Sequence, residues 1–159
     1  MARDPARDLN LHGKAWLAFG IGPQRQPPAL HRLEVPLSRA RLALLTTGGF
    51  VPPGGEPFNT GRRGDASFRE IDRGIEPGGL AIHHPHYDSA PAKLDINVLF
   101  PLPLCKELVA EGKLGELADR HYSFMGYVPL TRPLEKIYAP QVARRLKQQE
   151  VDAVLLTPA

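Results

Sequence analysis

Three histidines, a tyrosine and an aspartate lie within six residues of this sequence, in the segment HHPHYD from His83 to Asp88. A second His-Tyr pair, His121-Tyr122, follows in the segment RHYSFMGY. Histidine is the side chain that exchanges protons near neutral pH, and a neighbouring carboxylate can orient its ring. We therefore predict acid–base chemistry, with His86 and His121 as proton donors at one pocket and Asp88 orienting an imidazole.

A metal site is the alternative for the same side chains. One loop could turn His83, His86 and Asp88 toward a common ion, and His121 would complete the set. His-x-x-His in a loop is a weak metal signal compared with two histidines four residues apart on a helix, and no soft thiol ligand accompanies these residues. We therefore favour proton transfer over metal binding, and we expect His84 to point to solvent.

The segment GDASFRE, from Gly64 to Glu70, has two interpretations. In the first, Ser67 and backbone N–H groups hold a carboxylate while Arg69 pairs with it through two hydrogen bonds. In the second, Asp65 or Ser67 caps the N-terminus of a helix. Both interpretations stay open at this point.

The single cysteine, Cys105, also has two interpretations. A thiol at the start of a helix would have a lowered pKa and would be a better nucleophile. Its neighbours Leu102, Leu104 and Leu108 are typical of a hydrophobic core, so we predict a buried structural thiol.

Strands alternating with helices must position these groups. Apolar segments predict strands at residues 42–45, 80–82, 96–100 and 151–156, and helical spacing is found at 104–112 and 133–150, with a break or a second start at Pro140. A long loop is expected at residues 51–72. This alternation favours an α/β fold, a single domain with a mostly parallel sheet flanked by helices.

Polar residues follow several of these predicted strands. Thr47, Gly48 and Gly49 follow the first strand, the His83 segment follows the second, and Thr157 follows the last. The carboxyl ends of parallel strands lie at one edge of a sheet, where ligands bind in open α/β folds. We therefore expect these segments to converge on one rim.

The composition narrows the class of protein. The chain has 159 residues, of which 42% are hydrophobic and 23% charged, as in a soluble domain with one core. Residues 1–30 are rich in proline and glycine and are expected to form an irregular N-terminal arm before the domain at 31–159. A net charge of +3 with scattered arginines does not favour nucleic-acid binding. The single cysteine and the absence of a long apolar run predict a cytoplasmic protein without a membrane segment.

Six segments in order carry a resemblance to a known family: TTGGF, GDASFREI, HHPHYD, DINVLFP, EGKLGELADRHYSFMGY and VDAVLLT. Together they resemble the selenoprotein B family, the substrate-activating subunits of glycine, sarcosine and betaine reductases and of D-proline reductase, with cysteine-containing relatives. The resemblance covers roughly Arg32 to Ala159.

The resemblance implies cleavage of a carbon–nitrogen or related carbon–heteroatom bond alpha to a carbonyl group, in a small amino-acid-like substrate. A selenolate or thiolate attacks the alpha carbon and displaces the leaving group. Within this chemistry we assign proton transfer to His86, His121 and Tyr122. We assign substrate binding to six further residues, with Arg69 holding the carboxylate: Thr47, Gly48, Gly49, Ser67, Arg69 and His83.

The chain departs from the family pattern at its end. The redox-active selenocysteine or cysteine of the family follows the strand that matches VDAVLLT, whereas this sequence stops at Ala159 and Cys105 does not align with that position. The redox centre is therefore expected on missing sequence or on a partner, with no cofactor in this chain. The sheet is expected to be incomplete at its C-terminal end, with strand Val151 to Leu156 covered by another protein chain. A non-catalytic substrate-binding or scaffold subunit of a hetero-oligomeric complex is the alternative.

Overall fold

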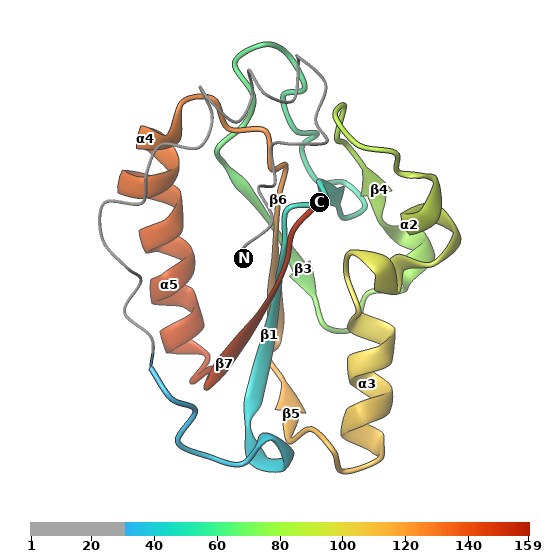
Figure 1. The fold of residues 1–159 in the computed structure, drawn as a ribbon, viewed down its shortest axis with the longest axis vertical. Coiled ribbons are helices and arrows are strands. Elements are labelled where there is room, and N and C mark those ends of the chain that lie inside the picture. The colour runs from blue at the N-terminus through green and yellow to red at the C-terminus, as the bar shows by residue number, and fades with distance from the viewer. Residues whose placement is uncertain (1–30) are drawn as a thin grey trace, which may run out of the picture. The chain divides into compact units, whose positions relative to one another are not determined.

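A computed structural model of the chain describes residues 31–159, and the predicted arm at residues 1–30 lies outside the described residues (Figure 1). The strands are β1 (Arg41–Thr46), β2 (Phe50–Val51), β3 (Phe68–Asp72), β4 (Ala81–Ile82), β5 (Glu116–Leu117), β6 (Arg120–Phe124) and β7 (Ala153–Thr157). The helices are α2 (Ala90–Leu94), α3 (Leu102–Ala110), α4 (Thr131–Pro133), the π-helical η4 (Leu134–Tyr138) and α5 (Ala139–Gln148), with 3-10 turns η1 (Leu37–Arg39), η2 (Pro77–Gly79) and η3 (Ile96–Val98). Within residues 31–159, each helix is too short or too polar to span a lipid bilayer.

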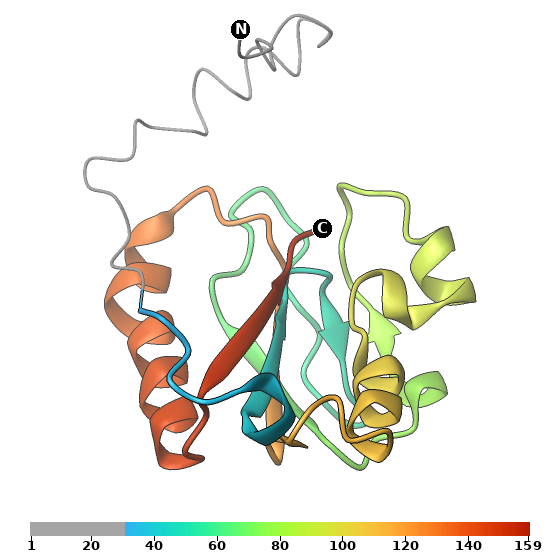
Figure 2. The same ribbon diagram turned by 60° about the horizontal axis from the view of Figure 1, so that its bottom comes forward.

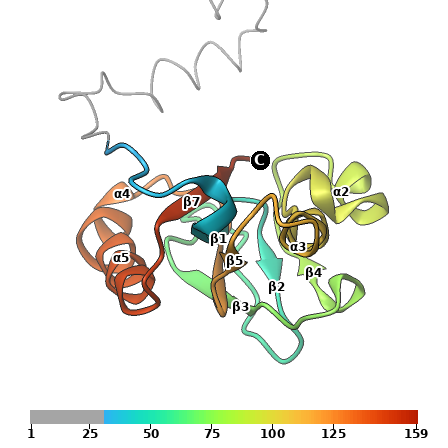
Figure 3. The ribbon, with the colours of Figure 1, turned by 90° about the horizontal axis from the view of Figure 1, so that it is seen from below.

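Five strands form one sheet with β1 at its centre (Figures 2 and 3). Parallel strands flank β1 on both edges, because Leu45 pairs with Tyr122 of β6 and with Leu156 of β7. β5 pairs with the beginning of β1, and β3 pairs antiparallel with β6. A separate antiparallel pair, β2 with β4, follows the end of β1. The predicted α/β fold with a mostly parallel sheet is therefore confirmed.

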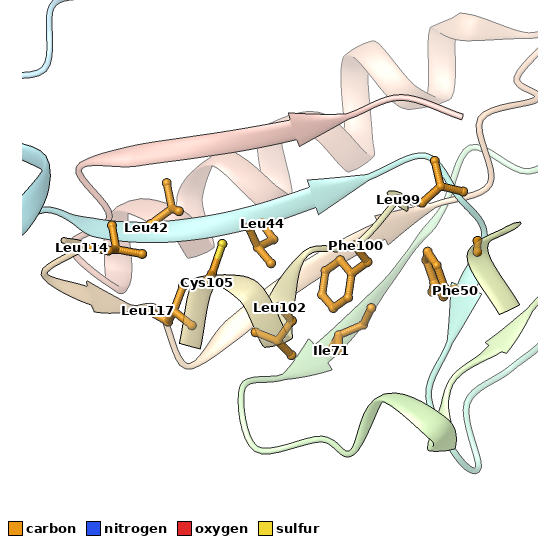
Figure 4. Close-up of a cluster of buried hydrophobic side chains, with 11 residues drawn as sticks. Leu42, Leu44, Phe50, Ile71, Leu99, Phe100, Leu102, Cys105, Leu114 and Leu117 are labelled. Atoms are coloured by element: carbon orange, nitrogen blue, oxygen red, sulfur yellow. The ribbon is translucent and has the colours of Figure 1, made fainter. Parts of the chain in front are cut away.

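The central strand is apolar from Leu42 to Leu45, as expected for a strand whose sheet is covered by helices on both faces, with α3 on one side and α5 on the other (Figure 1). On the α3 side, Leu42 and Leu44 pack in a cluster that includes Phe100 and Leu102 (Figure 4). On the α5 side, Leu45 packs against a cluster of Tyr122, Phe124 and Val142. Both faces of β1 are therefore hydrophobic core.

Cys105 belongs to the cluster under α3 and is buried, with a relative exposure of 4% (Figure 4). Burial raises the pKa of its thiol. The predicted structural thiol is confirmed, because a protonated thiol inside the core is a poor nucleophile.

The C-terminal helical segment contains the predicted irregularity at Pro140. The N–H of Ala139 donates to the carbonyl of Leu134, five residues earlier, so the chain is π-helical before α5 begins. Pro140 has no N–H with which to continue the usual bond to a carbonyl four residues back. A widened turn at this point lets one helix end and a second begin without a loop.

Three secondary-structure predictions are wrong. Residues 96–100 do not form the expected strand. Ile96–Val98 form the 3-10 turn η3, because the carboxylate of Asp95 accepts the N–H of Asn97 (2.9 Å). The expected loop at 51–72 contains β3, which pairs with β6 along its whole length. Since Phe68 begins a strand, the helix-cap interpretation of Asp65 and Ser67 is wrong as well.

Candidate functional site

The ends of β1 and β7 meet at the predicted rim. The N–H of Thr47 donates to the carbonyl of Thr157 (3.1 Å), and the N–H of Ala159 donates to Oγ1 of Thr47 (2.9 Å). On the other edge, the N–H of Gly49 donates to the carbonyl of Phe124 (2.9 Å) at the end of β6. The turn after β1 is therefore tied to both neighbouring strands.

The segment His83–Asp88 lies against this same turn. The N–H of His83 donates to the carbonyl of Gly49 (2.8 Å), and the hydroxyl of Tyr87 donates to the carbonyl of Gly48 (2.9 Å). Gly49 has a φ of 71°, and a Cβ there would lie 2.5 Å from the carbonyl oxygen of His83. Only glycine permits both this backbone conformation and this close approach. Thr47, Gly48, Gly49 and His83 are therefore brought together, as expected.

His84 and His86 occupy different environments within the segment. Nδ1 of His84 accepts the N–H of His86 (3.1 Å), and its ring lies 4.5 Å from the Tyr87 ring. Burial and the proximity of His86 lower the pKa of His84. Because Nδ1 accepts a hydrogen bond, the neutral form of the ring carries its proton on Nε2. His84 is thus half-buried against the rim, and the expectation that it points to solvent is wrong. His86 is exposed, with its ring 4.3 Å from the ring of Tyr127.

The carboxylate of Asp88 serves the backbone. Its Oδ1 accepts the N–H of Ala90 (2.9 Å) at the start of α2, and within residues 31–159 it has no hydrogen bond to an imidazole. The structure also places no group of three or more histidine, cysteine or acidic side chains in the described region where they would hold a metal ion. The site is therefore a cluster of aromatic and imidazole groups around the turn.

The second His-Tyr pair lies inside the sheet. His121 is fully buried on the α3 side, near Phe100, whereas Tyr122 faces the α5 side and packs against Phe68. Successive side chains of a strand point to opposite faces, so these two rings cannot serve one site. The hydroxyl of Tyr122 accepts a hydrogen bond from Gln149 (3.1 Å). Neither ring contributes to the rim, and we leave both out of the site.

The side chain of His121 accepts a backbone hydrogen bond of β1 where the strand pairing is interrupted. From Arg41 to Leu45 is four residues, but the partners Glu116 and Tyr122 are six apart, so two residues bulge between β5 and β6. At this gap Nδ1 of His121 accepts the N–H of Leu44 (3.1 Å). Burial lowers the pKa of His121 to about 4, so the ring is neutral at pH 7. This histidine takes the place of a backbone acceptor.

The guanidinium of Arg69 makes structural contacts within the chain. Its guanidinium donates to the carbonyls of Glu56 (2.5 Å) and Pro57 (3.0 Å) and lies over the ring of Phe58, 4.2 Å from its centroid. It also donates to the hydroxyl of Ser67 (2.8 Å). These contacts fasten the loop before β3 and leave Arg69 poorly placed for a substrate carboxylate.

Ser67 is part of the same network. Its N–H and its hydroxyl both donate to Oδ1 of Asp65. The other carboxylate oxygen, Oδ2 of Asp65, lies 3.7 Å from the guanidinium of Arg69. Burial raises the pKa of Asp65, but hydrogen bonds from Ser67 and Asn59 outweigh it and hold the pKa below its usual value. The predicted anion clamp is thus already occupied by an aspartate of the chain itself.

Sequence reasoning did not assign Tyr87 and Tyr127 to the site. Tyr87 is adjacent to His86, but only the fold shows that its hydroxyl reaches Gly48. Tyr127 meets His86 from 41 residues away, and no sequence signal indicates that contact.

Comparisons with known proteins add an independent finding. A model of the family described as glycine/sarcosine/betaine reductase selenoprotein B matches residues 28–159. The D-proline reductase subunit gamma of Acetoanaerobium sticklandii is 33% identical over 135 residues, which are 85% of this chain and 55% of that protein. The glycine reductase complex component B subunit gamma of Symbiobacterium thermophilum is 33% identical over 125 residues, 76% of this chain and 29% of that protein. The betaine reductase complex component B subunit beta of Peptoclostridium acidaminophilum is 32% identical over 125 residues, 76% of this chain and 28% of that protein.

No solved structure matches the chain. The chain spans about half the length of the D-proline reductase subunit and under a third of the other two relatives. The family match begins before β1 and continues through β7, so it includes the turn, the histidine segment and both edges of the rim. The chain therefore belongs to the glycine/sarcosine/betaine reductase selenoprotein B family.

Proposed function

We propose that the chain supplies the substrate-facing domain of a reductase complex, which cleaves a carbon–nitrogen or related carbon–heteroatom bond alpha to a carbonyl group of a small amino-acid-like substrate. The observation that carries this proposal is the meeting of the end of β7, the turn at Thr47–Gly49 and the histidine segment at one rim. The relatives named above are subunits of reductases for D-proline, glycine and betaine.

The nucleophile of this reaction is a selenolate or thiolate from outside this chain. It attacks the alpha carbon, a carbon–chalcogen bond forms, and the electron pair of the broken bond leaves with the nitrogen. Cys105 does not suit this role, because it is buried in the core and its pKa is raised. Ala159 is held at Thr47, so a chalcogen beside Ala159 would face the turn and the histidine segment.

The departing nitrogen needs a proton, and we assign its donor to His86. A general acid must reach the reacting atoms, and His86 is exposed whereas His121 is sealed in the core. Its backbone is held by His84, and its ring rests on Tyr127. Within this proposal, Asp88 positions the start of α2 and acts on His86 only through the backbone.

A partner polypeptide segment covers β7 in this proposal. Within residues 31–159 this strand pairs only with β1, and Val154, Leu155 and Leu156 have relative exposures of 37%, 39% and 63%. An apolar strand edge left open is prone to pair with another chain. The relatives are components of complexes, in which such an edge would be occupied.

The proposal is tested on the complex purified from its native host through a tag on this chain. With dithiothreitol as electron donor, we expect consumption of at least one of D-proline, glycine and betaine. Replacing His86 by alanine should lower the rate roughly 100-fold or more, as is typical for loss of a general acid. The control is His31→Ala, which removes another exposed histidine before β1 and should leave the rate unchanged.

The burial of the only cysteine favours a second candidate, a subunit that binds substrate without turnover. The same preparation separates the two. Substrate binding with no reduction by the whole complex would support the binding subunit, and equal rates for His86→Ala and His31→Ala would remove His86 from the mechanism.

A further inference from the structure

We infer that a pocket between the loop at residues 59–67 and the segment at residues 128–138 binds the carboxylate of a compact, carbon-rich ligand, with Arg63 as the residue that determines specificity. The pocket has a volume of about 290 Å³. That is the small end of the range for ligand pockets, and it suits a molecule of amino-acid size. Naming this ligand as the substrate rests on the proposed function, whereas the chemistry of the pocket rests on its own residues.

One side of the pocket is polar and is lined by Asn59, Arg63, Asp65 and Ser67. The charge of Asp65 is already compensated, because its carboxylate accepts the N–H groups of Asn59 (2.9 Å) and Ser67 (2.8 Å) and lies 3.7 Å from Arg69. Arg63 is exposed, and no acceptor within residues 31–159 forms a hydrogen bond or an ion pair with it. Its guanidinium is therefore the cation of this pocket that remains for pairing with a ligand carboxylate.

The other side of the pocket is apolar and is lined by Val128, Leu130, Pro133 and Tyr138. A ligand that carries only charged groups would leave this wall in contact with water. A pyrrolidine ring or N-methyl groups would cover it, and each methylene buried in this way raises affinity about fourfold. The pocket should therefore prefer cyclic or N-alkylated amino acids over glycine.

The loop that carries Arg63 is fixed in place before any ligand arrives. Gly64 has a φ of 62°, and a Cβ there would lie 2.1 Å from the carbonyl oxygen of Tyr127. The same carbonyl accepts the N–H of Asp65 (3.3 Å). A binding loop that is already ordered loses less entropy when a ligand binds.

The pocket and the proposed proton donor adjoin through one residue. The backbone of Tyr127 holds the loop of Arg63, and the ring of Tyr127 lies 4.3 Å from the ring of His86. Tyr127 therefore contacts both the loop that carries Arg63 and the ring of the proposed proton donor. Arg63 thus takes the role that the sequence suggested for Arg69, whose own N–H groups already donate to backbone carbonyls.

Calorimetric titration of the full chain with D-proline, D-prolinamide and glycine tests the inference. We expect D-proline to bind at least tenfold more tightly than glycine and D-prolinamide, which lack the apolar body and the carboxylate respectively. Arg63→Gln should weaken D-proline binding at least tenfold. Arg62→Gln, which removes the adjacent exposed arginine outside the pocket, should leave binding unchanged.

A second variant guards against an indirect effect. Ala66 also lines the pocket, and Ala66→Leu should block binding by filling it while the charge at Arg63 is kept. Circular dichroism would show that each variant is folded. Absence of D-proline binding to the wild type, or equal binding by Arg63→Gln and wild type, would overturn the inference without touching the rate test on His86. Arg63-dependent binding in a complex that reduces nothing would instead overturn the proposed function alone.

Discussion

The two His-Tyr pairs of this chain look alike in sequence but lie in opposite settings. His86-Tyr87 is in a loop at the rim, where one ring is exposed and the tyrosine hydroxyl bonds to the turn after β1. His121-Tyr122 is in the middle of a strand, and both rings are buried on different faces of the sheet. The difference shows that residue type identifies what a side chain can do, whereas the element that carries it decides whether substrate can reach it.

The burial of His121 makes its removal the most damaging change we expect. Replacing it by alanine leaves the N–H of Leu44 without an acceptor and opens a cavity, which together should lower the free energy of unfolding by about 3 kcal/mol. Urea denaturation measures the loss. His86→Ala should change stability by less than about 0.5 kcal/mol, because its side chain is exposed. Similar losses for both variants would erase the contrast between the pairs.

The stability of the protein at low pH should also depend on the buried ring of His121. The folded protein holds the pKa of His121 at about 4, below the usual value of 6.5, so the unfolded state binds more protons as the pH falls through this interval. The stabilisation is complete above pH 6.5 and declines toward pH 4, with a total loss of about 3 kcal/mol. Denaturation between pH 7 and pH 4 measures it. His121→Asn keeps an acceptor but no titrating ring, and it should flatten this part of the profile.

The rim pair depends on a glycine turn, which a matched pair of variants can isolate. Gly49 and Gly54 both have a φ of 71°, but only a Cβ at Gly49 would meet another atom closely, the carbonyl oxygen of His83 at 2.5 Å. Gly54→Ala should lower the free energy of unfolding by about 1 kcal/mol, the strain of the backbone alone. Gly49→Ala should lower it by about 1–2 kcal/mol more and should shift the NMR signals of His83 and His84. Equal losses would show that the turn and the histidine segment do not press together.

The smallest effects should come from the two tyrosine hydroxyls. Tyr87→Phe and Tyr122→Phe each remove one hydrogen bond, to Gly48 and from Gln149, and each should lower the free energy of unfolding by about 1 kcal/mol. Their functional effects should differ. Tyr87→Phe should change turnover in the purified complex, whereas Tyr122→Phe should not. A change in turnover for Tyr122→Phe alone would return the buried pair to the site.

The parts of the fold that could be predicted from sequence have strong local signals. β1 and β7 are short apolar runs, and α3 and α5 have helical spacing, so the pattern of apolar residues alone identifies them. β6 was not predicted as a strand, because its histidine, tyrosine and serine are residue types typical of functional sites, although the sheet buries all three. Residues 96–100 show the opposite error, a predicted strand that does not form, because the carboxylate of Asp95 accepts the N–H of Asn97 and turns the chain.

The candidate site also has parts that could be predicted from local sequence signals and parts that could not. The turn at Thr47–Gly49 was predictable because glycines after an apolar strand mark the edge of a sheet where ligands bind. The role of His121 was not predictable, because it depends on two extra residues in the register between β5 and β6. Arg69 has the right chemistry for a carboxylate, and only the structure shows that carbonyls of the loop before β3 already occupy it.

The central position of β1 has a consequence for how the chain folds during synthesis. β1 leaves the ribosome first, yet its partners Glu116 and Asp152 follow 75 and 111 residues later. Sheets built from such distant pairings form slowly, because long loops must close before any strand contact is gained. The nascent chain therefore carries the strand Arg41–Thr46 unpaired until β5 and β6 have emerged. Apolar strands that stay unpaired in this way are prone to aggregate before the domain is complete.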